Sequence, residues 1–145
     1  MKTLLVPVDF SDASAAVLAA AGKLARAFSA RVVLLHVAPP DPAFIGYEPG
    51  PQTVRDSVAR ELAAEHRSLQ ALEKELADTG VSVTALVIQG YPAEKIVAEA
   101  AKLSADLIVM GSHGRGMLKH LLVGSVTEGV LRHAACPVMV VPHRR

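Results

Sequence analysis

Short apolar runs alternate with amphipathic stretches along the whole chain. Between the runs, apolar residues recur every three or four positions, which is the spacing of a helix with one buried face. The runs themselves are rich in Val, Leu and Ile and have the length of fully buried strands. They cover residues 3–8, 31–37, 81–88, 106–110 and 137–141. The pattern therefore predicts strands that are separated by helices from end to end.

The amphipathic stretches predict four helices. Residues 11–29 and 52–78 each carry an apolar stripe, a third helix begins at Pro92, and a fourth begins near Ser125. Proline suits the first turn of a helix, where its missing N–H costs nothing. The residues expected to face the core are Leu18, Ala21, Ala25 and Phe28 in the first helix, and Val54, Val58, Leu62, Leu69, Leu72 and Leu76 in the second.

Alternating strands and helices are typical of parallel βαβ units with right-handed crossovers. The sequence thus predicts an α/β fold, a doubly wound, Rossmann-like parallel sheet of five strands with helices on both faces. A length of 145 residues suits one domain, which we assign to residues 1–145. Ligands bind such sheets at the carboxyl ends of the strands. The proline-rich segment 38–51 follows the second strand and is expected at this edge.

Composition and charge narrow the function. Hydrophobic residues make up 51% of the chain and aromatic residues only 3%, so the core must be aliphatic. A net charge of +1 provides no strong field for nucleic acid. Every apolar run is too short for a signal peptide or a membrane span, so we expect a cytoplasmic protein without a membrane partner. Cys136, the single cysteine, lies in an apolar run and is expected to be a small core residue.

A glycine-rich loop follows the fourth strand and reads MGSHGRGMLKHLLVGSVT from Met110 to Thr127. Glycine permits positive φ and a close approach of backbone N–H groups to an anion, and the following helix start supplies further N–H donors. The loop therefore predicts a phosphate site. It lacks the Gly-Lys-Ser/Thr ending of a Walker A loop, and a dinucleotide fingerprint would follow the first strand instead. Both of those classes are disfavoured.

This arrangement resembles the universal stress protein family. The resemblance spans the chain and rests on VPVDFSDAS after the first strand, LLHV in the second, QGYPAEKI before the third helix, and GSVTEGVLRHAACPVMVVP at the end. In that family G-x2-G-x9-G-[ST] marks the members that bind ATP, and Gly111, Gly114, Gly124 and Ser125 match it. The resemblance implies a nucleotide-sensing stress-response protein, often a homodimer through its last strand, that acts on an unidentified protein partner.

The resemblance also implies a place for each part of the ATP molecule. Asp9 contacts the ribose, Pro7 and Val8 line the adenine side, and the main chain of Val37 recognises the adenine edge. The loop and the following helix hold the rest of the ligand, with or without a bridging Mg²⁺ or Mn²⁺ ion. These residues are Met110, Gly111, His113 and Gly114 along the ribose and first phosphates, and Gly124, Ser125, Val126 and Thr127 at the outer phosphates.

Structural roles compete for two of these positions. Ser125 and Glu128 form the pattern S-x-x-E of a capping box, in which the two side chains satisfy the first N–H groups of a helix. A ligand is then not needed to explain Ser125. Asp9, Ser11 and Asp12 are all good N-cap residues for the first helix. The position of Asp9 at the end of the first strand favours the binding role.

The sequence favours binding over catalysis. It contains no recognisable pairing of a nucleophile with a base, so no catalytic residue is assigned and slow ATP hydrolysis is the most that we expect. A nucleotide hydrolase or nucleotidyl transferase, and an AMP or cyclic AMP binder, remain the alternatives. His113 and His120 fit no zinc spacing, His36 is expected to be a satisfied core residue, and Arg115 and Lys119 are equally suited to phosphate contact or to solvation.

Overall fold

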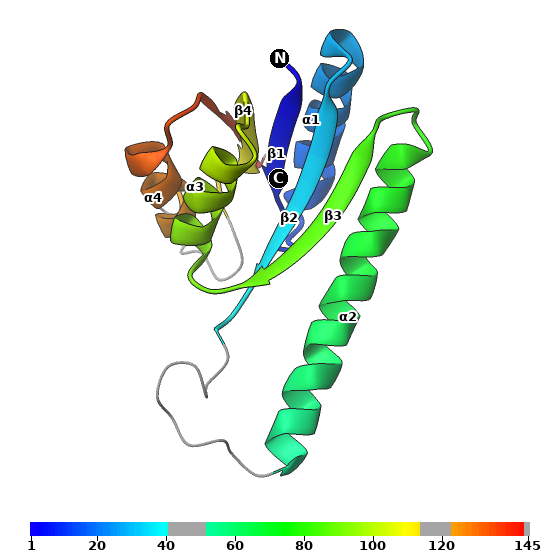
Figure 1. Ribbon diagram of the computed structural model, residues 1–145, viewed down its shortest axis with the longest axis vertical. Helices are drawn as coiled ribbons and strands as arrows, with labels where there is room; N and C mark the ends of the chain where they lie inside the picture. Colours follow the sequence, from blue (N-terminus) through cyan, green and yellow to red (C-terminus); the bar gives the residue numbers. More distant parts are fainter. Residues whose placement is uncertain (41–51, 114–122, 144–145) are drawn as a thin grey trace.

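The computed structural model describes residues 1–40, 52–113 and 123–143 (Figure 1). Strands and helices alternate there as the sequence predicts, and their boundaries differ from the predicted ones by a few residues at most. The elements are β1 (Thr3–Pro7), α1 (Ser14–Phe28), β2 (Arg31–Ala38), α2 (Gln52–Ala77), β3 (Val83–Gln89), α3 (Pro92–Lys102), β4 (Leu107–Gly111), α4 (Ser125–His133) and β5 (Val138–Val141).

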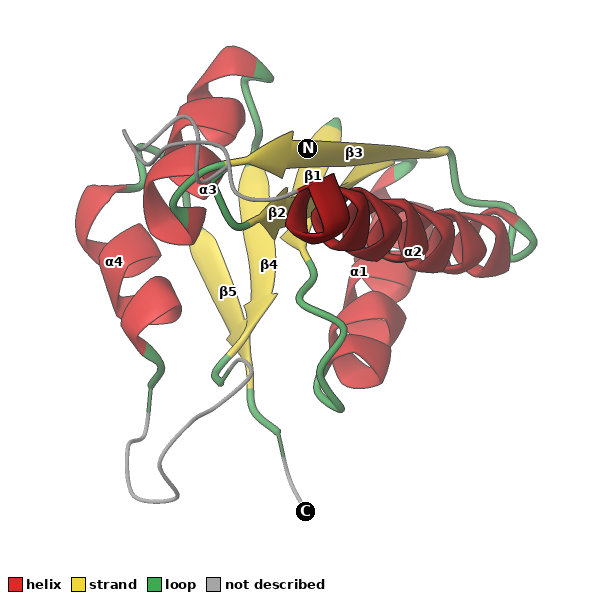
Figure 2. Ribbon diagram, turned by 90° about the horizontal axis from the view of Figure 1, so that it is seen from below, coloured by secondary structure: helices red, strands yellow, loops and turns green. Residues whose placement is uncertain are grey.

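The strands form one parallel sheet in the order β3-β2-β1-β4-β5. The chain starts in the middle of the sheet, proceeds to the β3 edge, and then crosses back to β4 and β5. This reversal places α1 and α2 on one face and α3 and α4 on the other (Figure 2). The prediction of a doubly wound parallel sheet with helices on both faces is confirmed.

The core consists of two aliphatic layers, one on each face of the sheet. Within β1, Leu4 and Val6 pack toward α1 and α2, whereas Leu5 packs toward α3 and α4. All three side chains are fully buried. Burying a side chain of this size stabilises a protein by about 1.5–3 kcal/mol. The layers account for the near absence of aromatic residues, because branched aliphatic side chains fill the space between a sheet and its helices.

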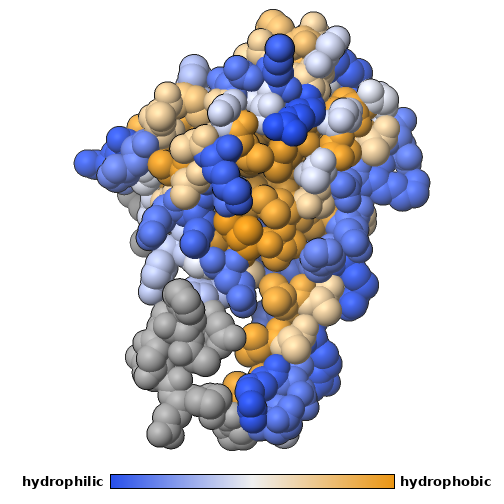
Figure 3. Space-filling view, viewed as in Figure 1, coloured by the Kyte–Doolittle hydropathy of each residue, from blue (hydrophilic) through white to orange (hydrophobic). Residues whose placement is uncertain are grey.

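The β3 side of the sheet is less completely covered on the face that carries α3. Leu86 and Ile88 of β3 are half-buried there and, like Val97 of α3, pack at the margin of the buried cluster on this face. Figure 3 shows the resulting apolar area over β2 and β3, in the centre of the face seen in Figure 1. The helices on this face therefore lie mainly over the other strands, next to the carboxyl edge where β1 and β4 end.

Three of the expected core positions are wrong. Phe28 at the end of α1 is 52% exposed, and Val54 and Val58 of α2 are 49% and 36% exposed. The amino-terminal half of α2 extends past the end of the sheet, as Figure 1 shows, so its apolar stripe has no strand beneath it. Of the second helix, Leu69 and Leu76 are buried as expected. A helical period identifies an apolar face but not what covers it.

Cys136 also differs from the expectation of a residue in a buried strand. It lies in the turn before β5 and is half-buried against the cluster of side chains between the sheet and α3 and α4. Burial raises the pKa of the Cys136 thiol. The thiolate is the reactive form of cysteine, so this shift favours the inert, protonated thiol.

Asp106 fixes the start of β1 against the start of β4. Its Oδ2 accepts hydrogen bonds from the backbone N–H groups of Lys2, at 2.7 Å, and Thr3, at 2.9 Å. These two bonds hold the pKa of the Asp106 carboxyl below its usual range. Because β1 and β4 are the strands between which the chain reverses, this carboxylate helps to align the strand pair that the site depends on.

The lowered pKa gives a testable pH dependence. The stabilisation from Asp106 is present above the pKa of the unfolded chain, about 3.9, and is lost as the pH falls through the lower pKa of the folded state. We expect Asp106→Asn to lower the free energy of unfolding at neutral pH and to have a smaller effect near pH 3, as measured by urea denaturation. Asp78→Asn, in an exposed pair with Lys74, is the control and should change little. An equal loss at both pH values for Asp106→Asn would contradict this account.

Candidate nucleotide site

A pocket of about 250 Å³ opens at the carboxyl ends of β1, β2 and β4. It lies where β1 and β4 are neighbours and their following helices diverge to opposite faces, which is the position expected for a ligand in a doubly wound sheet. Most of the residues predicted from the sequence line it. They are Pro7, Val8, Asp9, Val37, Met110, Gly111, Gly124, Ser125, Val126 and Thr127.

One predicted residue that the structure describes is not brought into this pocket, and another lies outside the described residues. His113 is not among the lining residues, and its ring Nδ1 lies 2.8 Å from the Oγ of the buried Ser112. Gly114 lies outside the described residues, as do Arg115, Lys119 and His120. The described part of the pocket is thus built from the ends of three strands, from the β1–α1 turn and the start of α1, and from the starts of α3 and α4.

Sequence reasoning missed several lining residues that come from the same edge of the fold. Every helix that follows a parallel strand begins at the carboxyl edge, so the starts of α1 and α3 could have been included on topology alone. Leu35 and His36 were missed because only Val37, the last residue of the predicted second strand, was assigned to the site, although the residues just before it lie at the same carboxyl end. The missed residues are Ser11, Ala13, Ser14, Val17, Leu35, His36, Pro92 and Ile96.

Asp9 closes the turn that leads out of β1. Its Oδ1 accepts a hydrogen bond from the N–H of Ser11 at 3.0 Å, and Phe10 between them has a positive φ of 59°. The helix α1 begins only at Ser14, with Ala13 as N-cap residue and no side-chain cap. The alternative that Asp9, Ser11 or Asp12 caps α1 is therefore wrong. Asp9 forms an Asx-turn at the pocket wall instead.

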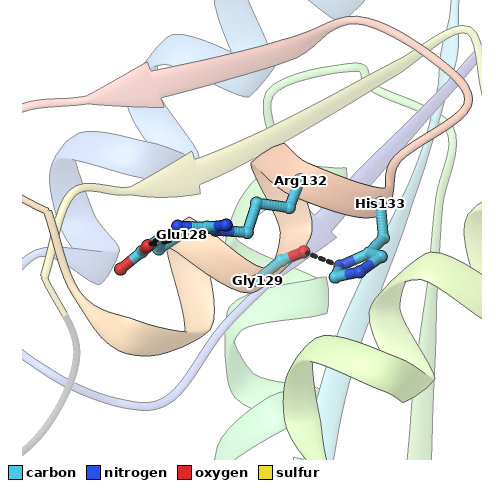
Figure 4. Close-up of polar contacts among 4 residues, drawn as sticks. All are labelled: Glu128, Gly129, Arg132 and His133. Carbon is cyan, nitrogen blue, oxygen red and sulfur yellow. Dashed lines mark hydrogen bonds and ion pairs between the residues drawn. The ribbon is translucent and has the colours of Figure 1, made fainter.

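The start of α4 lacks the predicted capping box. Gly124 is the N-cap residue, Ser125 is already helical, and the N–H of Glu128 donates to the Gly124 carbonyl at 2.8 Å. The Glu128 carboxylate is turned toward Arg132, whose Nη2 and Nε lie 2.7 and 3.1 Å from its Oε1 (Figure 4). The structural alternative for Ser125 is wrong for this reason: an i,i+4 ion pair takes the carboxylate that the box requires.

This geometry leaves the first turn of α4 directed at the pocket. Ser125, Val126 and Thr127 all line it. Their N–H groups precede the first possible i→i−4 hydrogen bond within the helix, and the helix dipole gives them partial positive charge. Main-chain N–H groups at such a position form an anion site without any basic side chain.

The described glycines of the loop do not need a left-handed backbone. Gly124 has a φ of −72°, and Gly111 is the last residue of β4, so the expected positive φ is wrong at these two positions. At Gly111 an added Cβ would lie 3.4 Å from both the Ala13 Cβ and the His113 carbonyl oxygen, which is ordinary van der Waals contact. The end of β4 passes close to the start of α1 there, and this packing alone does not require glycine.

Two hydrogen bonds hold the ends of the loop together. The N–H of Gly124 donates to the Ser112 carbonyl at 2.8 Å, and the Oγ1 of Thr127 donates to the Gly111 carbonyl at 2.9 Å. The Thr127 side chain is buried. Its hydroxyl hydrogen is therefore committed to the protein, and the group that Thr127 can offer a phosphate is its main-chain N–H. The start of α4 is thereby fixed next to the end of β4.

The described residues were also searched for other chemistry. Among residues 1–40, 52–113 and 123–143, no group of three His, Cys, Asp or Glu side chains is close enough to hold a metal ion. Likewise, no helix in these ranges has the length and apolar character needed to cross a membrane. What the described site offers a ligand is an apolar cavity with a helix N-terminus at one end.

The Thr127 bond yields a prediction about stability. Thr127→Val keeps the shape of the side chain but leaves the Gly111 carbonyl without this donor, so we expect a loss of about 1–3 kcal/mol in the free energy of unfolding. Ser125→Ala should change it by less than about 0.5 kcal/mol, because Ser125 is exposed and caps nothing. Chemical denaturation measures both. A larger loss for Ser125→Ala than for Thr127→Val would restore the capping role.

The chain matches known proteins over nearly its whole length. It is 36% identical to universal stress protein MJ0531 of Methanocaldococcus jannaschii over 142 residues, which is 97% of this chain and 81% of the relative. The solved structure of MJ0577 from the same organism is 32% identical, with a TM-score of 0.83 over 99% of this chain and 97% of that chain.

Two further universal stress protein structures share the fold. One is a complex with cAMP and the other, from Archaeoglobus fulgidus, is a complex with dAMP; each has a TM-score of 0.68 and covers 97% of this chain. The aligned regions span 96% of the chain in the cAMP complex and 97% of the chain in the dAMP complex, at 24% and 23% sequence identity. Residues 1–142 of this chain match the family model itself. The chain belongs to the universal stress protein family.

Proposed function

We propose that the pocket binds ATP and that the protein is a nucleotide-sensing module of the stress response. The observation that carries the proposal is the pairing of an apolar cavity with the uncapped start of α4. Val8, Val37 and Met110 supply an apolar wall suited to an adenine ring. The N–H groups at the start of α4 supply donors suited to phosphate oxygens.

The polar groups of the pocket match the remaining parts of the nucleotide. Asp9 lies between the apolar wall and the β1–α1 turn, where its carboxylate can accept from ribose hydroxyls. Gly111 and Gly124 line the pocket at the two ends of the loop, and neither carries a side chain that could cover the main chain from phosphates. The glycine pattern G-x2-G-x9-G-[ST] supports a triphosphate.

The ligands of related structures and the absence of a metal-binding cluster in the described ranges both concern which nucleotide binds. The family structures with cAMP and dAMP show that those proteins hold adenine nucleotides with one phosphate, so AMP and cyclic AMP are alternatives to ATP here. In the described ranges no trio of carboxylate, histidine or cysteine side chains converges, so a Mg²⁺ or Mn²⁺ ion would be held chiefly by the phosphate oxygens. We further propose a cytoplasmic location, where the Cys136 thiol stays reduced.

We also propose a homodimer through β5. The carbonyls of Pro137 and Val141 accept hydrogen bonds from the N–H groups of Ile108 in β4 and of Ser112 directly after it. The alternate residues Val138 and Val140 therefore direct their main-chain groups away from the sheet. At the opposite edge, the N–H of Ala85 in β3 donates to Glu73 of α2 at 3.0 Å. That edge is partly occupied by a side chain, which favours strand addition at β5.

The dimer proposal predicts a selective effect of proline. Val140→Pro removes an outward N–H from β5 without removing a bond to β4, so we expect it to convert a dimer into a monomer. Val140→Ala keeps the N–H and should remain dimeric. Light scattering after size exclusion, at one protein concentration, distinguishes them. A Val140→Pro protein that is as dimeric as Val140→Ala would place the interface elsewhere.

The ATP proposal predicts that a larger side chain at Gly124, at the end of the loop, weakens nucleotide binding. Gly124 is buried in the pocket wall, and its φ of −72° is acceptable to valine. We expect Gly124→Val to weaken ATP binding at least about tenfold in calorimetry, which is about 1.4 kcal/mol, with an unchanged far-UV spectrum. Ala19→Val, on the exposed side of α1, is the control. Unchanged affinity in Gly124→Val would refute the site.

Two measurements on the wild-type protein separate the alternatives. Mass spectrometry of nucleotide that co-purifies with the protein identifies ATP, AMP or cyclic AMP directly. Incubation with ATP and Mg²⁺ then tests catalysis: turnover at about 1 s⁻¹ or faster, the range of ordinary enzymes, favours a hydrolase over a sensor. Bound ATP that is released intact supports the sensor.

A further inference from the structure

The proposed function leaves one buried polar residue of the pocket without a role. His36 is only 6% exposed and lies in β2, one position before Val37. Its Nδ1 lies 2.9 Å from the Val8 carbonyl oxygen, and its Nε2 lies 3.1 Å from Oε2 of Glu65 in α2. One imidazole ring therefore joins the end of β1 to a helix that is far away in the sequence.

The first contact holds the turn that presents Asp9. Val8 is fixed on both sides, since its N–H donates to the Leu35 carbonyl at 2.8 Å and its own carbonyl faces His36. The next turn residue, Phe10, has a positive φ, which is unfavourable for a bulky side chain and needs support from its surroundings. The His36 ring supplies such support, because its centroid lies 4.6 Å from that of Phe10.

Hydrogen-bond chemistry determines which nitrogen of the His36 ring carries a proton. A carbonyl oxygen only accepts hydrogen bonds, so the Nδ1 of His36 must carry a proton when it bonds Val8. The contact between Nε2 and Glu65 is a close approach of 3.1 Å to Oε2 that lacks the geometry of a hydrogen bond. The Glu65 side chain is 18% exposed, so the pair is largely shielded from water. Shielding strengthens such a contact and makes an unpaired group costly.

We propose that His36 and Glu65 are positioning residues of the nucleotide pocket. His36 fixes the Val8 carbonyl and Phe10 so that Asp9 faces the ribose, and Glu65 fixes His36. The proposal rests on the proposed nucleotide function, because its effect is on the affinity of the same pocket. The contact between His36 and Glu65 also connects α2 to the site. Neither residue is assigned a contact with the phosphates of the ligand.

Two conservative substitutions separate the contacts of the ring. The amide nitrogen of asparagine is placed like Nδ1, so His36→Asn can still donate to Val8 but loses Glu65. The longer glutamine places its amide nitrogen like Nε2, so His36→Gln can reach Glu65 but not Val8. Both variants lose the ring contact with Phe10, so we expect His36→Gln, which also loses the contact with Val8, to bind ATP at least about tenfold more weakly than His36→Asn in calorimetry. His66→Asn, on the exposed side of α2, is the control.

A double-mutant cycle tests the part played by Glu65. Glu65→Gln should weaken ATP binding in the wild-type background and have no effect in His36→Asn, where its partner is gone. Equal effects in both backgrounds would show that Glu65 acts without His36. Glu65 is partly exposed, so this variant keeps the proposal testable if His36→Gln does not fold.

Measurements on the protein without nucleotide distinguish the positioning role of His36 from the proposed nucleotide binding. The N–H of Ser11, bonded to Asp9, should exchange with solvent faster in His36→Gln than in the wild type or His36→Asn. Nitrogen NMR of the imidazole should show a protonated Nδ1 in the wild type. If the wild type binds no adenine nucleotide, the proposed function fails while these readouts still test His36. Equal Ser11 exchange and equal ATP affinity in the Asn and Gln variants would overturn the positioning role.

Discussion

The parallel pairing of β1 with β4 is the constraint on which the rest of this structure depends. The chain leaves β1 toward one face of the sheet, through α1, and leaves β4 toward the other face, through α4. Since no single helix can cover the point where the two directions separate, a cavity remains at the carboxyl ends of these strands. The aliphatic layers on either side make this arrangement rigid, and Asp106 aligns the two strands at their other end.

The chemistry of the site comes mainly from the backbone. Side chains that could compete for the start of α4 are engaged elsewhere: Glu128 pairs with Arg132, and the Thr127 hydroxyl bonds the Gly111 carbonyl. The N–H groups of the first helical turn are thereby left facing the cavity. On the opposite wall, the turn after β1 is shaped by Asp9, Phe10 and the buried ring of His36. Main-chain donors suited to an anion and a shaped apolar slot thus lie within one pocket.

The fold and the position of the candidate pocket could be predicted from the sequence because both follow from local patterns. Aliphatic runs specify buried strands, their alternation with helices specifies a parallel sheet, and a glycine-rich loop after a strand specifies the ligand edge. The errors occurred where a local pattern has two physical outcomes. The S-x-x-E pattern at Ser125 fits a capping box, but the same glutamate also pairs with Arg132 one turn later. The apolar stripe at Val54 looks like a core face, although the sheet ends before it.

Other features could not be predicted because they depend on contacts between distant parts of the chain. Nothing near His36 in the sequence indicates that its ring meets Glu65, since α2 reaches β2 only in the folded protein. The same holds for the exposure of Phe28 at the end of α1, because the helical period does not show whether another element covers the last turn. Local sequence thus determines which elements form and in what order, whereas the support behind the binding groups is tertiary.

The account's central claim is that an adenine nucleotide binds with its phosphates at the start of α4 and its base against β1 and β2. A titration of the ¹⁵N-labelled protein with adenosine, AMP and ATP tests this most directly by amide chemical shifts. The account predicts that the amides of Val126 and Thr127 shift more with each added phosphate, while the amide of Val37 shifts alike with all three ligands. Shifts confined to the groove between α1 and α2, around Leu18 and Leu72, would contradict it.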